Sequence, residues 1–287
     1  VLLPLVLAGV LLSLIPGLDW PLQLTAELLD WSVRALGWLA DLPWATASMG
    51  ARPLWVWAVA FAGVALLLAP RGIPGRWLGL VLALPLYWVR PDQPAPGEVW
   101  ISLLDVGQGL AMVAETASGT LVYDAGPAYP SGFETGSQVV IPFLRSRGID
   151  RVERLVISHA DRDHAGGAAA VVAAVHVGQI DSGEPAALKL PDVRPCRAGE
   201  GWEWAGVSFR YLHPSAQGET GNDASCVLRI ATPGASLILT GDLGSKMERR
   251  LVERRGAALD AEVLIAGHHG SATSTSAELL DAIAPSW

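Results

Sequence analysis

The sequence predicts two parts: a set of apolar helices, then a mixed α/β domain in which helices cover two sheets. The 287 residues are 51% hydrophobic and only 17% charged, which is apolar for a soluble enzyme. Residues 1–97 hold eight of the twelve Trp, with five Arg against five acidic residues, so the net charge of −8 belongs to residues 98–287. Amphipathic Trp rings are typical of membrane interfaces. The first part is therefore expected to sit in lipid.

Three apolar segments, residues 1–15, 54–69 and 77–89, are expected to cross a membrane. Each is shorter than the roughly 17–25 residues that a spanning helix needs, so flanking Trp and Arg would have to complete the span. Helices buried in a protein core are the alternative. Residues 21–44 instead combine Leu at helical spacing with interrupting charges, which is typical of a helix lying in the interface.

The charged residues between these segments predict an orientation. The connection 70–76 carries two Arg and no acid, whereas residues 16–53 carry two Arg and four acids. Because positive charge marks the cytoplasmic side, the part after residue 91 is expected outside the cytoplasm. If residues 77–89 do not span, the orientation inverts. The chain begins with Val1 and ends at Trp287 directly after an expected helix, so we expect it to be cut at both ends.

A proline-rich linker, residues 91–97, separates helices in 1–90 from a second domain in 98–287 that is expected to be truncated at its C-terminus. β-rich runs ending in Gly or Asp predict strands, and longer runs predict helices. Strands are expected at 99–104, 110–115, 121–123, 154–157, 207–212, 226–231, 236–239 and 262–266. Helices are expected at 138–147, 168–175, 246–255 and 276–283.

Potential metal ligands follow three of the apolar strands. His159, Asp161, Asp163 and His164 crowd the loop after strand 154–157, and Gly166 and Gly167 are expected to keep the next helix from obstructing that loop. Later strands end at Gly241-Asp242 and at Gly267-His268-His269. A polar loop with a capping Asp or His is the alternative for the first group. The three groups together indicate a site for adjacent metal ions.

At these positions the chain resembles the metallo-β-lactamase superfamily, in which a His-x-His-x-Asp-His loop, a bridging Asp and a final His surround one or two metals. The resemblance implies an αββα sandwich. It assigns metal ligation to His159, Asp163, His164, Asp242 and His268, and it places Asp161 where a His is usual. The superfamily's middle His has no counterpart, because residues 221–225 occupy its region. One ion is therefore expected to be loosely held.

Three motifs narrow the resemblance to the ComEC/Rec2 family of DNA-internalisation (competence) proteins. They are Leu-Leu-Asp-Val-Gly-Gln-Gly at 103–109, Ser-His-Ala-Asp-Arg-Asp-His-Ala-Gly-Gly at 158–167 and His-His-Gly-Ser at 268–271. The resemblance implies DNA uptake across the cytoplasmic (inner) membrane in natural transformation, with single-stranded DNA in transit. It also implies contact with membrane lipid and with other DNA-uptake proteins. The second domain then becomes a candidate nuclease that degrades the strand that is not imported.

The expected ligand set is rich in oxygen, with the carboxylates of Asp161, Asp163 and Asp242 beside three imidazoles. Mn²⁺ or Zn²⁺ is therefore expected, with Mg²⁺ competitive. Two such ions would lower the pKa of a water and hold the attacking and leaving oxygens of a phosphodiester, with Asp163, His164 and Asp242 at the centre of catalysis. Residues expected to support the ligands or touch substrate are Asp105, Asn222, Asp223, His269 and Ser271.

Two other functions stay open. A domain of charge −8 should repel phosphate, and the arginine clusters 145/147/151/154 and 249/250/254/255 form either basic strips or solvated helix faces. A DNA-guiding channel module without catalysis is one alternative. The other is a hydrolase of small molecules such as a lactam or thioester.

The two cysteines, Cys196 and Cys226, lack metal-finger spacing. A disulfide between them would close a loop of about 30 residues, stabilise the fold by roughly 3 kcal/mol and require an oxidising compartment. Two unrelated buried thiols are the alternative. A disulfide would support the placement outside the cytoplasm.

Overall fold

The computed structural model describes residues 2–42, 50–70, 72–215 and 218–287. The chain divides into two compact units, Val1–Ser48 and Met49–Trp287, which are described separately. Val1 and Trp44, the outer ends of two helices expected from the sequence, lie outside the described residues.

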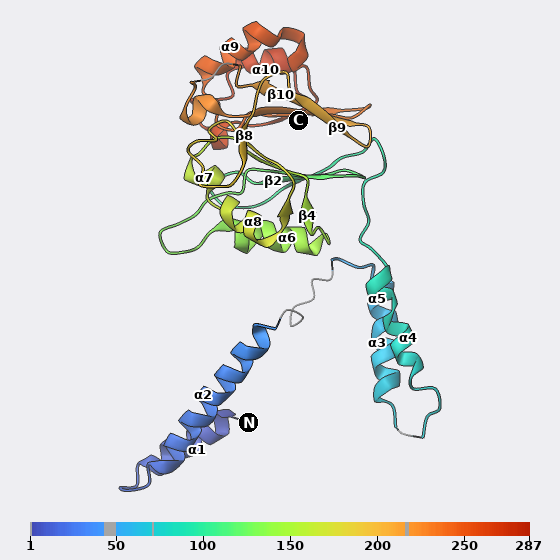
Figure 1. Cartoon of the computed structure of the whole chain (residues 1–287), viewed down its shortest axis with the longest axis vertical. Coiled ribbons are helices and arrows are strands. Elements are labelled where there is room, and N and C mark those ends of the chain that lie inside the picture. The colour runs from blue at the N-terminus through green and yellow to red at the C-terminus, as the bar shows by residue number, and fades with distance from the viewer. Residues whose placement is uncertain (1, 43–49, 71, 216–217) are drawn as a thin grey trace. The chain divides into compact units, whose positions relative to one another are not determined.

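The first unit is a helical hairpin of α1 (Leu2–Ser13) and α2 (Trp20–Ala40) (Figure 1). Gly9 lies against the backbone of Leu22 and the hydroxyl of Thr25, where any side chain would be crowded, so the two helices approach closely. Large apolar side chains of both helices, such as Leu11 and Trp31, are exposed.

The second unit begins with the apolar helices α3 (Leu54–Leu68), α4 (Leu78–Ala83) and α5 (Pro85–Trp88). Gly63 and Gly79 lie against each other's backbone where α3 and α4 pack. The segment expected at 77–89 is helical but interrupted at Leu84, because the ring and missing N–H of Pro85 break the hydrogen-bond ladder between α4 and α5.

Three segments were expected to span a membrane, and the described part of the chain holds no helix with both the length and the apolarity for a crossing.

Two β-sheets form the rest of the second unit, and each is covered by helices on its outer face (Figure 1). The six-stranded sheet has the order β1-β2-β3-β5-β7-β8. Its strands are β1 (Trp100–Leu103), β2 (Met112–Glu115), β3 (Thr120–Tyr123), β5 (Arg154–Ile157), β7 (Ile180–Ser182) and β8 (Val193–Pro195). A wide helical turn (Gly136–Val140) and the helices α6 (Ile141–Ser146), α7 (Arg162–Ala165) and α8 (Ala168–Ala174) accompany this sheet.

The five-stranded sheet has the order β13-β12-β11-β10-β9. Its strands are β9 (Gly201–Trp204), β10 (Val207–His213), β11 (Val227–Ala231), β12 (Ser236–Leu239) and β13 (Val263–Ile265). The helices α9 (Ser245–Arg255) and α10 (Ala277–Ile283) cover it. Short 3₁₀ turns lie at Gly221–Ala224, Gly256–Leu259 and His268–Gly270, and β4 (Arg151–Val152) pairs separately with β6 (His176–Val177).

Three apolar cores hold these layers together. One core lies between the six-stranded sheet and its helices and includes Val122 and Leu144. A second lies between the two sheets and includes Tyr123 and Phe209, and a third joins the five-stranded sheet to α9 and α10. The expected αββα sandwich is therefore confirmed.

Parallel neighbours in each sheet determine where the polar loops meet. β3 runs parallel to β5, and β12 runs parallel to β13. The carboxyl ends of parallel neighbours lie at the same edge of a sheet, which is where ligand-binding loops of α/β folds gather. The loops after these four strands carry the candidate site.

Several short strands escaped the sequence analysis. β7 is a fully buried strand between β5 and the edge strand β8, although Asp181 interrupts its apolar pattern. Asp181 accepts hydrogen bonds from the guanidinium of Arg154 at 2.8 Å and from the hydroxyl of Tyr211 at 2.7 Å. A buried carboxylate with such partners is tolerated in a strand, but the partners cannot be read from the strand's own residues.

A disulfide between Cys196 and Cys226 joins the end of β8 in one sheet to the start of β11 in the other, with Cα atoms 5.9 Å apart. The Tyr123 hydroxyl donates a hydrogen bond of 2.6 Å to the carbonyl of Cys226. Both interactions connect the two sheets close to the loops that carry the candidate site.

Replacing Cys196 and Cys226 together by Ala should lower the free energy of unfolding by about 3 kcal/mol, because the cross-link closes a loop of 30 residues in the unfolded chain. Urea unfolding followed by Trp fluorescence measures the difference. The reduced wild-type chain should match the double variant. A loss below about 1 kcal/mol in both would contradict the expectation.

Candidate metal centre

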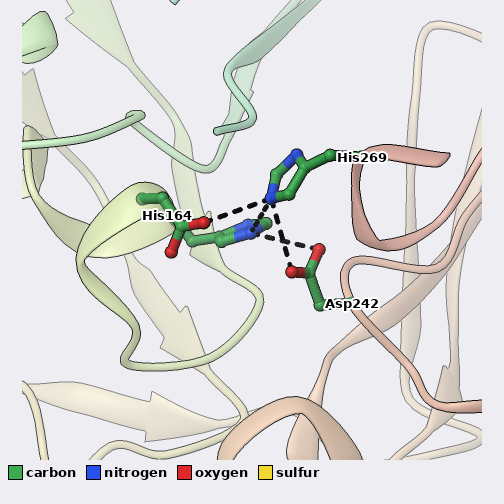
Figure 2. A group of neighbouring side chains, drawn as sticks. His164, Asp242 and His269 are labelled. Atoms are coloured by element: carbon green, nitrogen blue, oxygen red, sulfur yellow. Dashed lines mark hydrogen bonds and ion pairs between the residues drawn. The ribbon is translucent and has the colours of Figure 1, made fainter. Parts of the chain in front are cut away.

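Four side chains from three loops converge at the edge where the two sheets meet. Asp163, His164, Asp242 and His269 each offer one ligand atom, and these atoms all lie within 4.8 Å of one another (Figure 2). His164 Nε2 lies 3.1 Å from Asp242 Oδ1 and 3.2 Å from His269 Nε2. His269 Nε2 lies 3.2 Å from Asp163 Oδ2 and 3.4 Å from Asp242 Oδ2. This spacing allows one cation to be shared.

His164 is held from behind by Asp124, which the sequence analysis missed. Asp124 follows β3, is fully buried, and places its Oδ2 atom 2.8 Å from His164 Nδ1. The other oxygen, Oδ1, accepts a 2.6 Å hydrogen bond from the backbone N–H of Ser158. A carboxylate that accepts from Nδ1 directs Nε2 of the imidazole toward the cluster, an arrangement typical of metal-ligating histidines.

Without an ion, the carboxylates of the site determine which of its groups carry a proton. Burial lowers the pKa of His164, but the negative charges of Asp124 and Asp242 outweigh it and raise the pKa to about 10. Burial raises the pKa of Asp242, but the bond to His164 and the charges of the nearby histidines outweigh it and lower the pKa. A positive charge is thus favoured between two acidic groups.

His159 offers a second, separate ligand atom. Its imidazole is fully buried, and its Nε2 atom has no hydrogen-bond partner within the described part of the chain. The Ser158 hydroxyl donates to Asp124 at 2.8 Å, so the 3.0 Å contact between Ser158 Oγ and His159 Nδ1 is donated by the imidazole. His159 Nε2 is then an unprotonated acceptor, and Asp161 Oδ2 lies 3.5 Å from it.

The residues present therefore fit divalent metal ions. A buried imidazole acceptor without a donor is costly unless something electrophilic meets it. Burial lowers the pKa of His159, and the charge of His164 lowers it further, which keeps the imidazole in the neutral form that binds metals. Carboxylate and imidazole groups together suit Mn²⁺ and Zn²⁺.

The last histidine of the cluster is His269 in the structure, whereas the sequence analysis assigned ligation to His268. His268 Nε2 lies 3.9 Å from Asp242 Oδ2, and its Nδ1 lies 3.1 Å from the hydroxyl of Thr273. Both histidines adopt left-handed backbone, with φ of 49° and 53°. That uncommon conformation decides which imidazole faces Asp242, and residue types alone do not reveal it.

Close backbone approaches explain the glycines of the motifs. At Gly109 any side chain would collide with the carbonyl of Asp163. Gly166 and Gly167 lie directly against the backbone of 125–128 and 136. They allow the start of α8 to pack beneath the loop after β3, which differs from the expectation that they clear space around the ligands.

The remaining expected residues lie outside the four-residue cluster. Asp105 is exposed and accepts a hydrogen bond from the backbone N–H of Gly107 in a turn. Ser271 contacts the hydroxyl of Thr273. Asn222 and Asp223 lie in the turn Gly221–Ala224, and the Asp223 carbonyl accepts a hydrogen bond from His213.

Two further residues position the site and had no clear sequence signal. The carboxylate of Glu184 accepts hydrogen bonds from the backbone N–H of Ala160 and of Gly221, so it ties the 159–164 loop to the turn before β11. Ser225 Oγ accepts a 3.2 Å bond from the backbone N–H of Asp242. Asp124 had a signal in the sequence, since it follows a strand just as Asp242 does. It was overlooked because Asp-Ala-Gly resembles an ordinary turn.

Three of the four arginines in the first cluster are held in ion pairs within the domain. Arg147 pairs with Glu115 and Arg154 pairs with Asp181, while Arg151 pairs with a neighbouring glutamate. The charges of these three arginines are thus offset by acidic partners, and Arg145 is exposed.

The sandwich and its metal-ligand cluster agree with a family match: residues 104–286 match the model of the metallo-beta-lactamase superfamily. The chain belongs to the metallo-β-lactamase superfamily. Residues 1–73 match a second model, described as competence protein. The resemblance to the ComEC competence family is confirmed by this pair of matches.

Two curated relatives match nearly the whole chain. Competence protein ComA of Neisseria gonorrhoeae is 37% identical over 100% of this chain and 40% of its own length. Uncharacterized protein YcaI of Escherichia coli is 31% identical over 98% of this chain and 36% of its own length. The chain thus spans about two fifths or less of the length of these relatives. A solved β-lactamase from Chitinophaga pinensis superposes with a TM-score of 0.48 at 14% identity, covering 69% of this chain and 92% of that one.

This metallo-β-lactamase-superfamily chain departs from the usual ligand pattern in the two places noted in the sequence. Asp161 replaces a histidine, and its side chain is 59% exposed. Residues 221–225 replace the middle histidine. Of these, Ser225 binds the backbone of Asp242 and Gly221 binds Glu184, so the segment supports neighbouring loops.

In the metal-free chain, the free energy of unfolding should fall as the pH rises from about 6.5 to about 10. The pKa of His164 is raised to about 10 in the folded protein, from about 6.5 in the unfolded chain. A raised pKa stabilises the fold fully below the unfolded value, and this contribution is lost as the pH passes the folded value. Urea unfolding in EDTA across this range measures the slope.

His164→Gln is the matched control, because it removes the titrating group and keeps a polar side chain of similar reach. The pKa values of His159 and His213 are both lowered, chiefly by burial, so these groups titrate below the range. The same slope in the wild type and in His164→Gln would show that His164 is not the titrating group.

Proposed function

We propose that the chain takes part in DNA uptake during natural transformation, and that its second domain is a metal-dependent phosphodiesterase acting on the strand that is not imported. The convergence of Asp163, His164, Asp242 and His269 within 4.8 Å carries this proposal. The match of residues 1–73 to a competence-protein model supports the uptake role, as does the similarity to competence protein ComA of N. gonorrhoeae.

The side chains have distinct roles in this proposal. Asp163, His164, Asp242 and His269 hold one divalent ion, while His159 and Asp161 supply ligands for a second. His268 lies 3.9 Å from Asp242 and takes part only if the turn rearranges. Bound Mn²⁺ or Zn²⁺, with Mg²⁺ as a weaker candidate, would lower the pKa of a water and neutralise phosphate charge. Asp124 keeps Nε2 of His164 directed at the cluster.

The exposure of the cluster favours a polymeric substrate. The side chains of Asp163, His268 and His269 are between 22% and 33% exposed, so the backbone of a long chain can reach them. A lactam or a thioester is typically enclosed by its pocket, whereas three side chains at this cluster stay partly open to solvent. The net charge of −8 opposes DNA binding, and bound cations offset part of it.

We place the protein in the cytoplasmic membrane, with the hydrolase domain on the extracytoplasmic side and with lipid, DNA and other uptake proteins as partners. Many large apolar side chains of α1–α5 are exposed, such as Leu54 at 87% and Leu68 at 79%, which supports contact with lipid. The disulfide between Cys196 and Cys226 supports an oxidising compartment.

Asp163→Ala should lower Mn²⁺-dependent cleavage of labelled DNA by about a hundredfold or more, because it removes an ion ligand at the centre of the cluster. The full chain in detergent is incubated with single- and double-stranded DNA, and products are resolved by length. Asp281→Ala is the matched control, since this exposed carboxylate lies on α10, outside the cluster.

Equal products from the wild type and Asp163→Ala would refute the nuclease. Binding of Mn²⁺ and DNA without any cleavage would favour the channel module that only guides DNA. Turnover of a chromogenic lactam without DNA cleavage would favour the small-molecule hydrolase.

A further inference from the structure

A hydrogen-bonded loop beside the candidate metal centre presents two exposed aromatic rings. Tyr129 is 44% exposed and Phe133 is 47% exposed, and their ring centroids lie 5.9 Å apart. Their backbones pair across the loop, with the Tyr129 N–H donating to the Phe133 carbonyl at 2.8 Å. The rings lie side by side at the tip of residues 127–135.

The base of this loop is firmly anchored. The buried hydroxyl of Thr135 lies 2.8 Å and 3.0 Å from the carbonyls of Ala125 and Pro127. The guanidinium of Arg162 donates to the carbonyl of Ala128 at 2.7 Å. These bonds hold the base of the loop in place. No residue in the described part of the chain covers the two rings.

Tyr129 borders the ligand cluster, and Phe133 lies beside Tyr129. One hollow of about 280 Å³ is lined by Tyr129, Arg162, Gln108 and Asp163, together with the loop backbone at 127–128. Asp163 Oδ2 lies 3.2 Å from His269 Nε2 inside the cluster. A group seated in this hollow is therefore next to any phosphodiester held at the metal centre.

We propose that Tyr129 and Phe133 form a stacking platform for an unpaired base of single-stranded nucleic acid, next to the phosphodiester that is cleaved. This inference rests on the proposed phosphodiesterase. Aromatic rings bind bases of any sequence through their faces, and an adjacent cation suits the backbone phosphate. The exposed rings supply the aromatic faces and Arg162 supplies the cation. The amide of Gln108 can hydrogen-bond a base edge.

The polar lining argues for a base over lipid. A loop that inserts into a membrane needs an apolar surround, whereas Gln108, Arg162 and Asp163 form one wall of the hollow beside Tyr129. A duplex keeps its bases stacked on one another, so the platform selects single strands or frayed ends.

The test compares two fluorescent oligonucleotides of equal length, one with bases and one with abasic spacers. Anisotropy titrations use the full chain in detergent, in EDTA so that nothing is cleaved. The wild type should bind the base-bearing strand about tenfold more tightly, since stacking typically contributes that much per base. Tyr129→Ala and Phe133→Ala should each reduce this ratio severalfold, and the double variant should bring it near one. Tyr129→Phe should retain it.

Trp287→Ala is the control, because this ring is 87% exposed and does not line the hollow. In Mn²⁺, the double variant should raise KM for single-stranded DNA and leave kcat and Mn²⁺ affinity unchanged. An unchanged binding ratio in the double variant overturns the platform. So does a blue shift of a bimane label on Phe133→Cys upon reconstitution into phosphatidylcholine vesicles, which would place the loop in lipid.

Failure of the nuclease is read separately. If Asp163→Ala cleaves DNA as well as the wild type while the binding ratio still depends on the two rings, the phosphodiesterase is wrong and the platform stands as a binding site for single strands.

Discussion

The second domain depends on one buried chain of charges, from Asp124 through His164 to Asp242. Each link is short, 2.8 Å between Asp124 and His164 Nδ1 and 3.1 Å between His164 Nε2 and Asp242. Two buried carboxylates are tolerated only with a positive charge between them. In the metal-free protein a proton on His164 supplies that charge, and in the proposed enzyme a divalent ion takes over. The fold therefore requires a positive charge at this point, from a proton or from an ion, even without a substrate.

The rest of the domain keeps that chain in place. The parallel strands β3 and β5 place Asp124 and the 159–164 loop at one edge of the six-stranded sheet. The parallel strands β12 and β13 place Asp242 and the histidine pair at the facing edge of the five-stranded sheet. The disulfide and the Tyr123 hydroxyl join the sheets beside these loops. Tyr129 borders the same edge with Phe133 beside it, so that one loop cluster combines the proposed cation site with the proposed platform for nucleic acid.

The sequence predicts ligand-rich loops because apolar runs, such as β5 and β12, end directly before them. Both strands lie where they were expected. Other features depend on contacts distant in sequence. Asp124 became identifiable only beside His164, and β7 only once Arg154 and Tyr211 were seen to satisfy Asp181. Left-handed backbone selected His269 over His268 as the side chain nearest Asp242.

The most direct measurement is anomalous diffraction from crystals of the chain soaked in Mn²⁺, recorded on both sides of the metal's absorption edge. We expect the strongest peak about 2.0–2.3 Å from ligand atoms of Asp163, His164, Asp242 and His269. A second, weaker peak should lie at a similar distance from Nε2 of His159. A peak that replaces His269 with His268 would revise the ligand set. Crystals soaked in Mn²⁺ and in Zn²⁺ that show no peak at any of these atoms would contradict the metal centre itself.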